Sequence, residues 1–273
     1  MLAPQRDALQ LSAKIGWGRL CTTPLDPGVW ALLEPAGLQN HAPQLCWLSP
    51  ERLACVWMAG GREGTAGMSI YWSELRAGRG RWSPPRLVSQ DPSRSEQNPL
   101  LMRLASGRLL LLHTAQQARD PEADRLASDT SFSMQWPARL RIQSRRVDGG
   151  RWTRARDLFP EPAFCRHPAH PLPDGGWVLP IYRSLEQGGG FGHDHSLVQH
   201  LSPDAEPLGE PCPIPNSIGR VHGSIVLSRD GRSLLQFFRS RLADRIYRSM
   251  AGLDGRDWSE PEPIPLPNNN SSI

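Results

Sequence analysis

The sequence has a single lysine, Lys14, so nearly all of its basic residues are arginines. It also lacks an apolar run approaching the roughly 20 residues that a membrane-spanning helix requires, and its first residues do not form a basic segment followed by an apolar stretch. These absences argue against a membrane partner and against export. The formal net charge is +4, but the arginines are interspersed with acidic residues and form no stripe, which argues against nucleic acid. Because arginine grips carboxylates through two parallel hydrogen bonds, a small anionic ligand is favoured.

Cysteine and histidine give no sign of a disulfide framework or a metal site. The five cysteines are an odd number at wide spacings, which predicts free thiols and favours the cytoplasm: Cys21, Cys46, Cys55, Cys165 and Cys212. His193 and His195 flank Asp194, but the spacing places no third ligand nearby. We therefore expect no metal and no cofactor, and interpret the glycine-rich stretch 188–190 as part of a loop over the ligand site.

A repeated hairpin organises the chain. In four segments a polar residue, usually with a proline, opens a short apolar strand, a tight turn follows and a second apolar strand returns. The segments start at intervals of 55 to 68 residues, at His41, Asn98, Arg166 and Val221. Their turns include Ser106-Gly107, Asp174-Gly175 and Asp230-Gly231, which are typical of β-hairpins.

A second pattern follows three of these hairpins: a strand ends in serine, and a glycine-bearing turn leads to tryptophan and then serine or threonine. The tryptophans are Trp82, Trp152 and Trp258. The segment from about 183 to 215 keeps a turn at 202–208 but lacks the tryptophan. Two hairpins per unit predict four-stranded antiparallel propeller blades, with the tryptophans packing between blades rather than contacting ligand. A pair of immunoglobulin-like sandwiches is the alternative fold, but it would not require two interleaved motifs at one period.

The ordered set of motifs resembles the bacterial sialidase-like (BNR or Asp-box repeat) propeller proteins from about residue 40 to the end. It includes Gly60-Gly-Arg-Glu-Gly64, Ile70-Tyr-Trp-Ser73, Leu179-Pro-Ile-Tyr182, Phe238-Arg-Ser240 and Trp258-Ser-Glu-Pro261. The resemblance implies an all-β, six-bladed propeller with its ligand site at the mouth of the central channel. Residues 41–273 would form the propeller, and residues 1–40 would contribute outer strands to a further, shared blade. Six blades at the observed intervals need more chain than 273 residues, so we expect an incomplete propeller that self-associates through open edges.

The resemblance also implies site residues: three arginines on the substrate carboxylate, an aspartic acid as acid/base, and a tyrosine nucleophile assisted by a glutamate. Here His41 stands where the first arginine is usual, and Gly67 stands where the aspartate is expected. Arg166 and Arg239 occupy positions of channel-facing arginines, and the blade with the tyrosine nucleophile is not in the chain. Glu63 is the one carboxylate that the motifs place near the site, as an acid/base in dry surroundings or as a loop cap. Asn98 and His222 join His41 and Arg166 as residues expected to line the channel; His222 is alternatively a core histidine.

These residues favour an exo-sialidase-like glycoside hydrolase that binds an acidic sugar or oligosaccharide at the channel mouth. The alternative is a non-catalytic propeller that binds a glycan or a protein, because a fold alone does not fix a function. A third hypothesis is a polysaccharide lyase, which would use Tyr182 and His222 as a pair in the channel.

Overall fold

The computed structural model describes residues 16–23, 26–118, 138–184 and 193–273, and their regular elements are β-strands. Four antiparallel sheets of four strands each follow one another along the chain. Blades 1 and 2 consist of β3 (Gln39–Ser49), β4 (Arg52–Gly60), β5 (Ser69–Arg76) and β6 (Arg86–Ser89), and of β7 (Arg94–Arg103), β8 (Arg108–Gln117), β9 (Ala138–Arg146) and β10 (Arg156–Asp157).

Blades 3 and 4 repeat this order in the second half of the chain. They consist of β11 (His170–Pro171), β12 (Trp177–Ser184), β13 (Asp194–Leu201) and β14 (Cys212–Pro213), and of β15 (Arg220–Leu227), β16 (Leu234–Ser240), β17 (Arg245–Ala251) and β18 (Glu262–Pro267). The predicted all-β propeller of four-stranded antiparallel blades is confirmed. No membrane-spanning helix occurs in the part of the chain that the structure describes.

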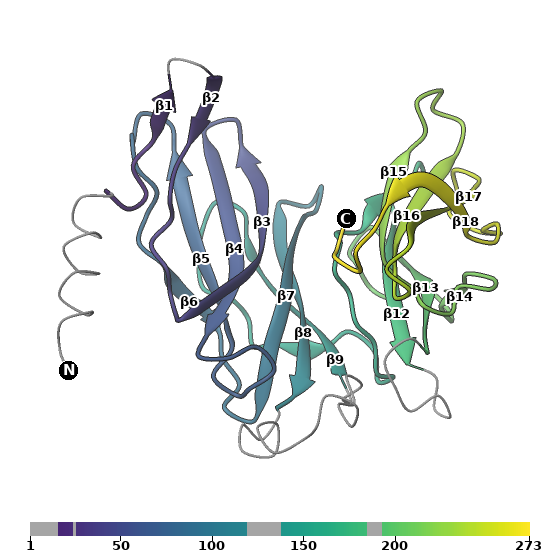
Figure 1. Ribbon diagram of the computed structural model, residues 1–273. Coiled ribbons are helices and arrows are strands. Elements are labelled where there is room, and N and C mark those ends of the chain that lie inside the picture. Colours follow the sequence, from purple (N-terminus) through teal and green to yellow (C-terminus); the bar gives the residue numbers. More distant parts are fainter. Residues whose placement is uncertain (1–15, 24–25, 119–137, 185–192) are drawn as a thin grey trace.

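Apolar side chains fill the space between successive blades. Separate buried clusters join blade 1 to blade 2, blade 2 to blade 3, and blade 3 to blade 4. Among the described residues no such cluster joins blade 4 to blade 1, so the ring of blades is open there. Figure 1 shows blades 1 and 2 on the left and blades 3 and 4 on the right, with the C-terminal segment between the two halves.

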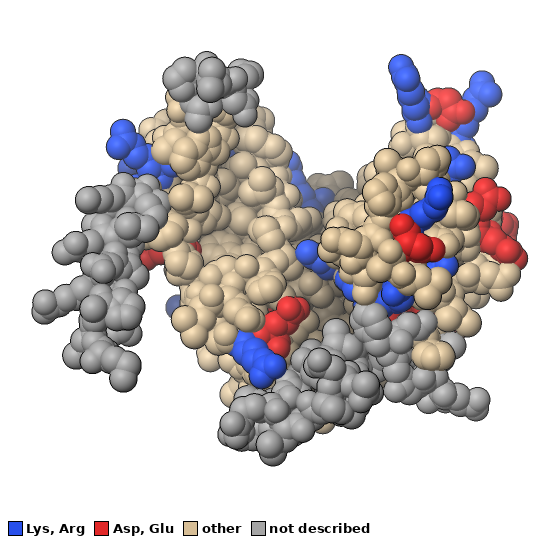
Figure 2. Space-filling view, in the orientation of Figure 1, with Lys and Arg blue, Asp and Glu red and all other residues tan. Residues whose placement is uncertain are grey.

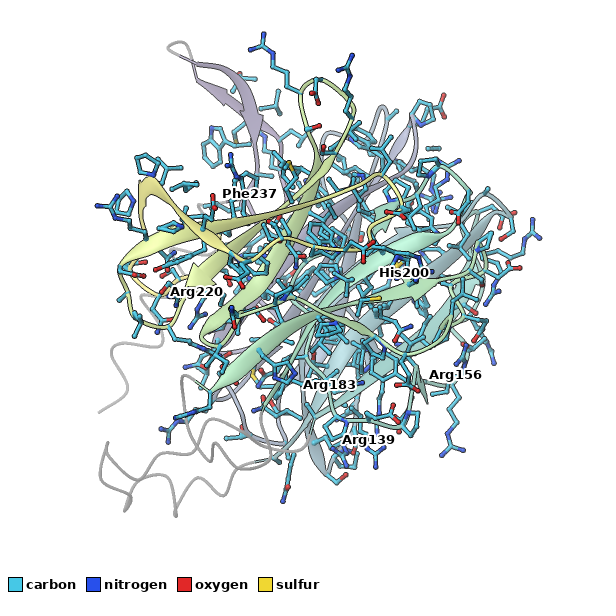
Figure 3. The ribbon with its side chains drawn as sticks, turned by 90° about the vertical axis from the view of Figure 1, so that its right-hand side faces the viewer. Arg139, Arg156, Arg183, His200, Arg220 and Phe237 are labelled. Carbon is cyan, nitrogen blue, oxygen red and sulfur yellow. The ribbon has the colours of Figure 1, made fainter. Side chains whose placement is uncertain are left out.

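Polar contacts reinforce the junction between blades 2 and 3. Arg156 forms an ion pair with Glu206 at 2.6 Å, and the Arg183 guanidinium lies 5.6 Å from the Phe159 ring centroid. Figure 3, which brings the right-hand side of the molecule to the front, labels Arg156 and Arg183 near this junction and His200 in blade 3. His200 Nε2 is 2.9 Å from the Asp254 carbonyl oxygen, which ties blade 3 to blade 4.

The inner strands of three blades carry a bulge at the same place. Ala42, Asn98 and His222 have φ angles of 51°, 52° and 56°, and the strand register shifts at each of them. The residue after the bulge is Pro43 or Pro99 in blades 1 and 2, which has no N–H to donate to the ladder, and Gly223 in blade 4, a residue type that often marks a bulge. A bulge redirects the side chains around it, and here it directs them toward the centre of the ring.

Blade 3 departs from this pattern. Its inner strand is reduced to His170–Pro171, preceded by an isolated bridge between Phe164 and Tyr182. Pro168, Pro171 and Pro173 lack backbone N–H groups and shorten the ladder. Arg166 therefore lies in an irregular segment instead of at the start of a strand.

The turns that lead to the repeated tryptophans share one hydrogen bond. In each, a strand N–H donates to the hydroxyl of the residue after the tryptophan at 2.9 to 3.0 Å: Glu74 to Ser83, Ser144 to Thr153, and Met250 to Ser259. Trp152 packs edge-on against Trp72 between blades 1 and 2, and Trp258 is buried between blades 3 and 4. Trp152 and Trp258 therefore pack between blades as predicted, whereas Trp82 packs with Trp57 on the outer face of blade 1.

The two outer faces of the open ring differ. Leu20, Ala31 and Leu33, which flank the small sheet of β1 (Cys21–Thr23) and β2 (Asp26–Trp30), pack with Trp57 and Trp82 on the outer face of blade 1. The division at residue 40 stays a prediction. On the outer face of blade 4, Val226 and Met250 are paired in register through Leu235 and are 43% and 52% exposed.

Candidate functional site

All four blades contribute to one pocket in the channel. Its volume is about 310 Å³, and we call it the channel pocket. It is lined by His41, Ala42, Met58, Glu63, Gln97, Asn98, Gln116, Phe164, Arg166, Tyr182, Asp194, His222, Arg239, Arg241 and Ser272. The structure thus brings together all six residues that the sequence singled out: His41, Glu63, Asn98, Arg166, His222 and Arg239. Figure 2 shows the hollow between the two halves of the molecule, with basic side chains on its walls.

Three arginines reach the channel pocket, and their surroundings differ. Arg241 donates to Asp194 Oδ2 from Nε at 2.8 Å and from Nη2 at 2.6 Å, and both side chains are more than nine-tenths buried. Arg239 Nε donates to Asn270 Oδ1 at 2.8 Å, and Arg166 has neither an ion pair nor a hydrogen bond within the described ranges. Arg166 and Arg239 therefore present guanidinium groups that no carboxylate of those ranges neutralises.

Burial makes these two cations costly. Desolvation lowers the pKa of Arg239 to about 10, with the nearby Arg241 adding to the effect. Desolvation also lowers the pKa of Arg166, which Tyr182 and Glu63 partly offset. Both side chains remain cationic at neutral pH, so a bound carboxylate would gain charge-assisted hydrogen bonds in surroundings that screen them less than water does.

An aromatic stack forms the wall beside the arginines. The Tyr182 ring lies 5.0 Å from Phe164, nearly parallel to it, and 5.2 Å from the His222 ring. Burial raises the pKa of Tyr182 above its usual range, so its hydroxyl stays protonated. Burial, with Arg239, Arg241 and Arg166 nearby, lowers the pKa of His222 well below its usual value. The pair thus combines a proton donor with a neutral imidazole, whose Nδ1 is 2.5 Å from Ser272 Oγ.

Glu63 lies at the more open side of the pocket. Its Oε2 is 3.9 Å from His41 Nδ1, and the two side chains are 48% and 42% exposed. The dry surroundings that the sequence-based hypothesis assumed for Glu63 are absent. Its catalytic role stays a prediction. Gly67 does not line the pocket, although a Cβ there would have room, since it would meet no atom closer than 3.9 Å.

The bulges place Asn98 and His222 one position later than His41. His41 precedes the bulge residue of its strand, whereas Asn98 and His222 are bulge residues themselves, so Gln97 is the counterpart of His41. Gln97 and Gln116 line the pocket and were not singled out from the sequence. No local signal marks them, because their position depends on a strand register that only the fold sets.

The Arg241–Asp194 pair was also missed as a site feature. The sequence signal for this pair was the spacing of Arg239 and Arg241, since residues two apart on an extended segment point to the same side. Asp194 appeared only as part of a histidine-rich stretch, and residues 188–190 of that stretch lie outside the described residues. In the ranges that the structure covers, no three His, Cys, Asp or Glu residues are grouped to hold a metal ion.

Four-stranded blades around an arginine-lined channel pocket define a sialidase-like β-propeller. Residues 51–273 match the BNR repeat-like domain family, and the chain belongs to it. A search of curated proteins gave no match.

Solved structures show the same fold at low sequence identity. A protein of unknown function from Dyadobacter fermentans matches with a TM-score of 0.65 and 15% identity, covering 83% of this chain and 69% of that one. A Hadza microbial sialidase matches at 0.65 and 11%, covering 90% and 52%. Trypanosoma rangeli sialidase in complex with sialic acid matches at 0.60 and 10%, covering 90% and 40%. The chain thus spans about half the length, or less, of these two sialidases.

Proposed function

We propose that the channel pocket binds an acidic sugar and that Arg166 and Arg239 hold its carboxylate. The observation that carries the proposal is the convergence of these two partly buried arginines on one pocket without a carboxylate partner in the described part of the chain. The similarity in fold to a sialidase solved with sialic acid supports it. Arg241, already paired with Asp194, would position the wall without gripping the ligand.

The size of the pocket supports a terminal sugar as the ligand. A volume of about 310 Å³ is at the small end of ligand pockets. The stacked Phe164 and Tyr182 rings offer an apolar surface beside the arginines. A single acidic residue at the end of an oligosaccharide would therefore fit better than the interior of a long chain.

Calorimetric titration with sialic acid and with glucuronic acid tests the binding. Arg166→Ala should weaken the affinity by about 1.5 to 3 kcal/mol, because a hydrogen bond to a charged group is lost. Arg229→Ala removes an exposed arginine from the blade 4 hairpin turn and should leave the affinity unchanged. Equal affinities of the wild type and the Arg166 variant would contradict the proposal.

Cleavage of the glycosidic bond is the finer part of the proposal, in two forms. In hydrolysis, Glu63 would donate a proton to the leaving oxygen and then activate water. The contact between Tyr182 and His222 favours elimination. In that reaction, neutral His222 would remove the proton from the ring carbon that bears the carboxylate. The bond to the leaving oxygen would break as a carbon–carbon double bond forms, and Tyr182 would protonate that oxygen.

Product analysis separates these possibilities. Incubation with acidic oligosaccharides should release a saturated sugar in hydrolysis, abolished by Glu63→Gln, or an ultraviolet-absorbing unsaturated sugar in elimination, abolished by Tyr182→Phe. Binding without either product would identify a non-catalytic glycan-binding propeller.

A further inference from the structure

A second and larger cavity lies at the outer rim between blades 1 and 2. Its volume is about 970 Å³, and it shares no lining residue with the channel pocket. Residues of β5, β6 and β9 and the turns before Trp82 and Trp152 form it, and we call it the rim groove. Its charged lining residues are six arginines and two acids: Arg52, Arg76, Arg79, Arg81, Arg86 and Arg145, with Glu74 and Asp148.

The two acids of the rim groove are already engaged. Glu74 accepts hydrogen bonds from Arg52 at 2.9 and 3.0 Å and from Arg76 at 2.8 Å. Asp148 pairs with Arg146, outside the groove lining, at 3.1 Å. Within the described ranges Arg79, Arg81, Arg86 and Arg145 form no ion pair. The groove thus has an excess of positive charge that its own acids do not neutralise.

Arg145 is held in place at the groove wall. Its guanidinium carbon lies 4.3 Å from the Trp72 ring centroid and 4.9 Å from that of Trp152. Its Nε and Nη2 are buried and have no hydrogen-bond partner in the described part of the structure. Desolvation lowers the pKa of Arg145, Glu74 partly offsets this shift, and the nearby Arg52 and Arg86 add to it. Burying these two N–H groups without partners costs free energy, which the contacts with the two indoles offset in part, and an anion in the groove would be attracted to the fixed charge of Arg145.

The backbone of the groove is accessible to a ligand. Gly78, Gly80, Gly149 and Gly150 line it, and a Cβ added at any of them would meet no atom within 4 Å. An exposed arginine is usually solvated by water and binds no ligand. Each of Arg79, Arg81 and Arg86 would be such a residue if it stood alone. Their gathering around a fixed, partly buried arginine and four bare glycines distinguishes this groove from such a surface.

We propose that the rim groove binds a small polyanion, with two or more oxyanion groups on a molecule the size of a short oligosaccharide. The planar fork of the exposed Arg86 suits carboxylate, sulfate and phosphate oxygens, and Arg145 adds a fixed positive charge at the wall. The volume is that of a ligand site for such molecules. This proposal does not rest on the function proposed for the channel pocket.

Calorimetric titration with three probes tests the proposal: a sulfated tetrasaccharide from heparin, trigalacturonate and inorganic tripolyphosphate. At least one should bind, with affinity that falls as salt is raised. Arg145→Gln and Arg86→Gln should each weaken that binding at least ten-fold. Preference for the two sugars identifies an acidic glycan as the ligand class, and preference for tripolyphosphate identifies a phosphorylated one.

Matched variants guard against general charge effects. Arg229→Gln removes an exposed arginine in blade 4 and should leave the binding unchanged. The titrations with the two sugars are repeated in an Arg166→Ala background, which weakens any binding of these sugars at the channel pocket, and the losses caused by Arg86→Gln and Arg145→Gln should persist there. Arg86 is exposed, so its variant should fold even if Arg145→Gln does not. The proposal is wrong if no probe binds, if Arg86→Gln binds like the wild type, or if Arg229→Gln weakens binding as much as Arg86→Gln does.

Discussion

The arginines of the channel pocket differ in whether a carboxylate pairs with them, and the ligand hypothesis rests on this difference. Arg241 is buried with Asp194, and a buried pair of this kind is costly to break from one side. Arg166 and Arg239 are also partly desolvated, but they have no such carboxylate partner in the described ranges. Arginine is abundant in the sequence, and the groups next to each arginine determine whether it has a structural role or is available to a ligand.

Histidine burial makes the stability of the protein depend on pH. Desolvation, with Arg166 nearby, lowers the pKa of His167 to about 4. As the pH falls below about 6.5, the unfolded chain takes up a proton that the folded chain does not. Stability should therefore decline between about pH 6.5 and 4, by on the order of 3 kcal/mol from His167 alone. Urea unfolding at several pH values between 5 and 7 measures the decline.

The variant His167→Gln isolates this contribution from the carboxylates that also titrate in acid. Its stability should change less between pH 6.5 and 5 than that of the wild type. An equal slope for the two proteins would show that His167 is not the cause.

Among the elements, the turns before Trp152 and Trp258 place an indole between two blades, and the turn before Trp82 places one on the outer face of blade 1. Each is fixed by a hydroxyl that accepts a strand N–H, and each places an indole against an apolar cluster. The turn at 202–208 lacks a tryptophan, yet β13 and β14 still pair, so the tryptophan is not needed to form a blade. Trp152 and Trp258 contribute instead to the junctions between blades.

Trp258→Ala should therefore destabilise the fold strongly. Trp258 is 4% exposed, and its Nε1 donates to the Gly255 carbonyl at 2.9 Å. Loss of a buried tryptophan costs about 3 to 5 kcal/mol. Trp47, 61% exposed on β3, is the matched control, and Trp47→Ala should change stability by less than about 0.5 kcal/mol. Comparable losses in urea unfolding of the two variants would contradict this role.

For the molecule as a whole, the open side of the ring is the main physical feature. The outer face of blade 4 exposes Val226 and Met250, and β3 of blade 1 exposes Leu45 and Trp47. Exposed apolar patches promote association. Self-association therefore stays a prediction, and these exposed apolar residues are the surface through which we expect it.

Sedimentation velocity of the 273-residue chain tests this prediction. The protein should form concentration-dependent oligomers, and Met250→Glu should shift the population toward monomer, because a charge would have to be desolvated in the contact. Leu208→Glu introduces the same charge at a residue of blade 3 that is 51% exposed, and should have little effect. A monomer at all concentrations, or equal effects of the two variants, would refute the prediction.

Repeats in the sequence were sufficient for the fold class. Glycine at the hairpin turns has positive φ, as at Gly107, Gly175 and Gly231, because those turns need it. Trp152 and Trp258 mark packing between blades, because burying a large indole there removes much apolar surface from water. The turn glycines and the tryptophans each depend on residues that are close together in the sequence, so the sequence alone is enough to recognise them.

The tertiary structure decided which side chains share a site. Arg166, His222 and Glu63 belong to three different blades. The shared register of the repeated hairpins predicted that Arg166 and His222 converge, and the family resemblance added Glu63. The one-residue offset between His41 and Asn98 depends on where each strand bulges, and the pairing of Arg241 with Asp194 joins blades 3 and 4. The rim groove likewise exists only because blade 1 packs against blade 2. Such contacts depend on strand register and blade packing, which no short segment of sequence encodes.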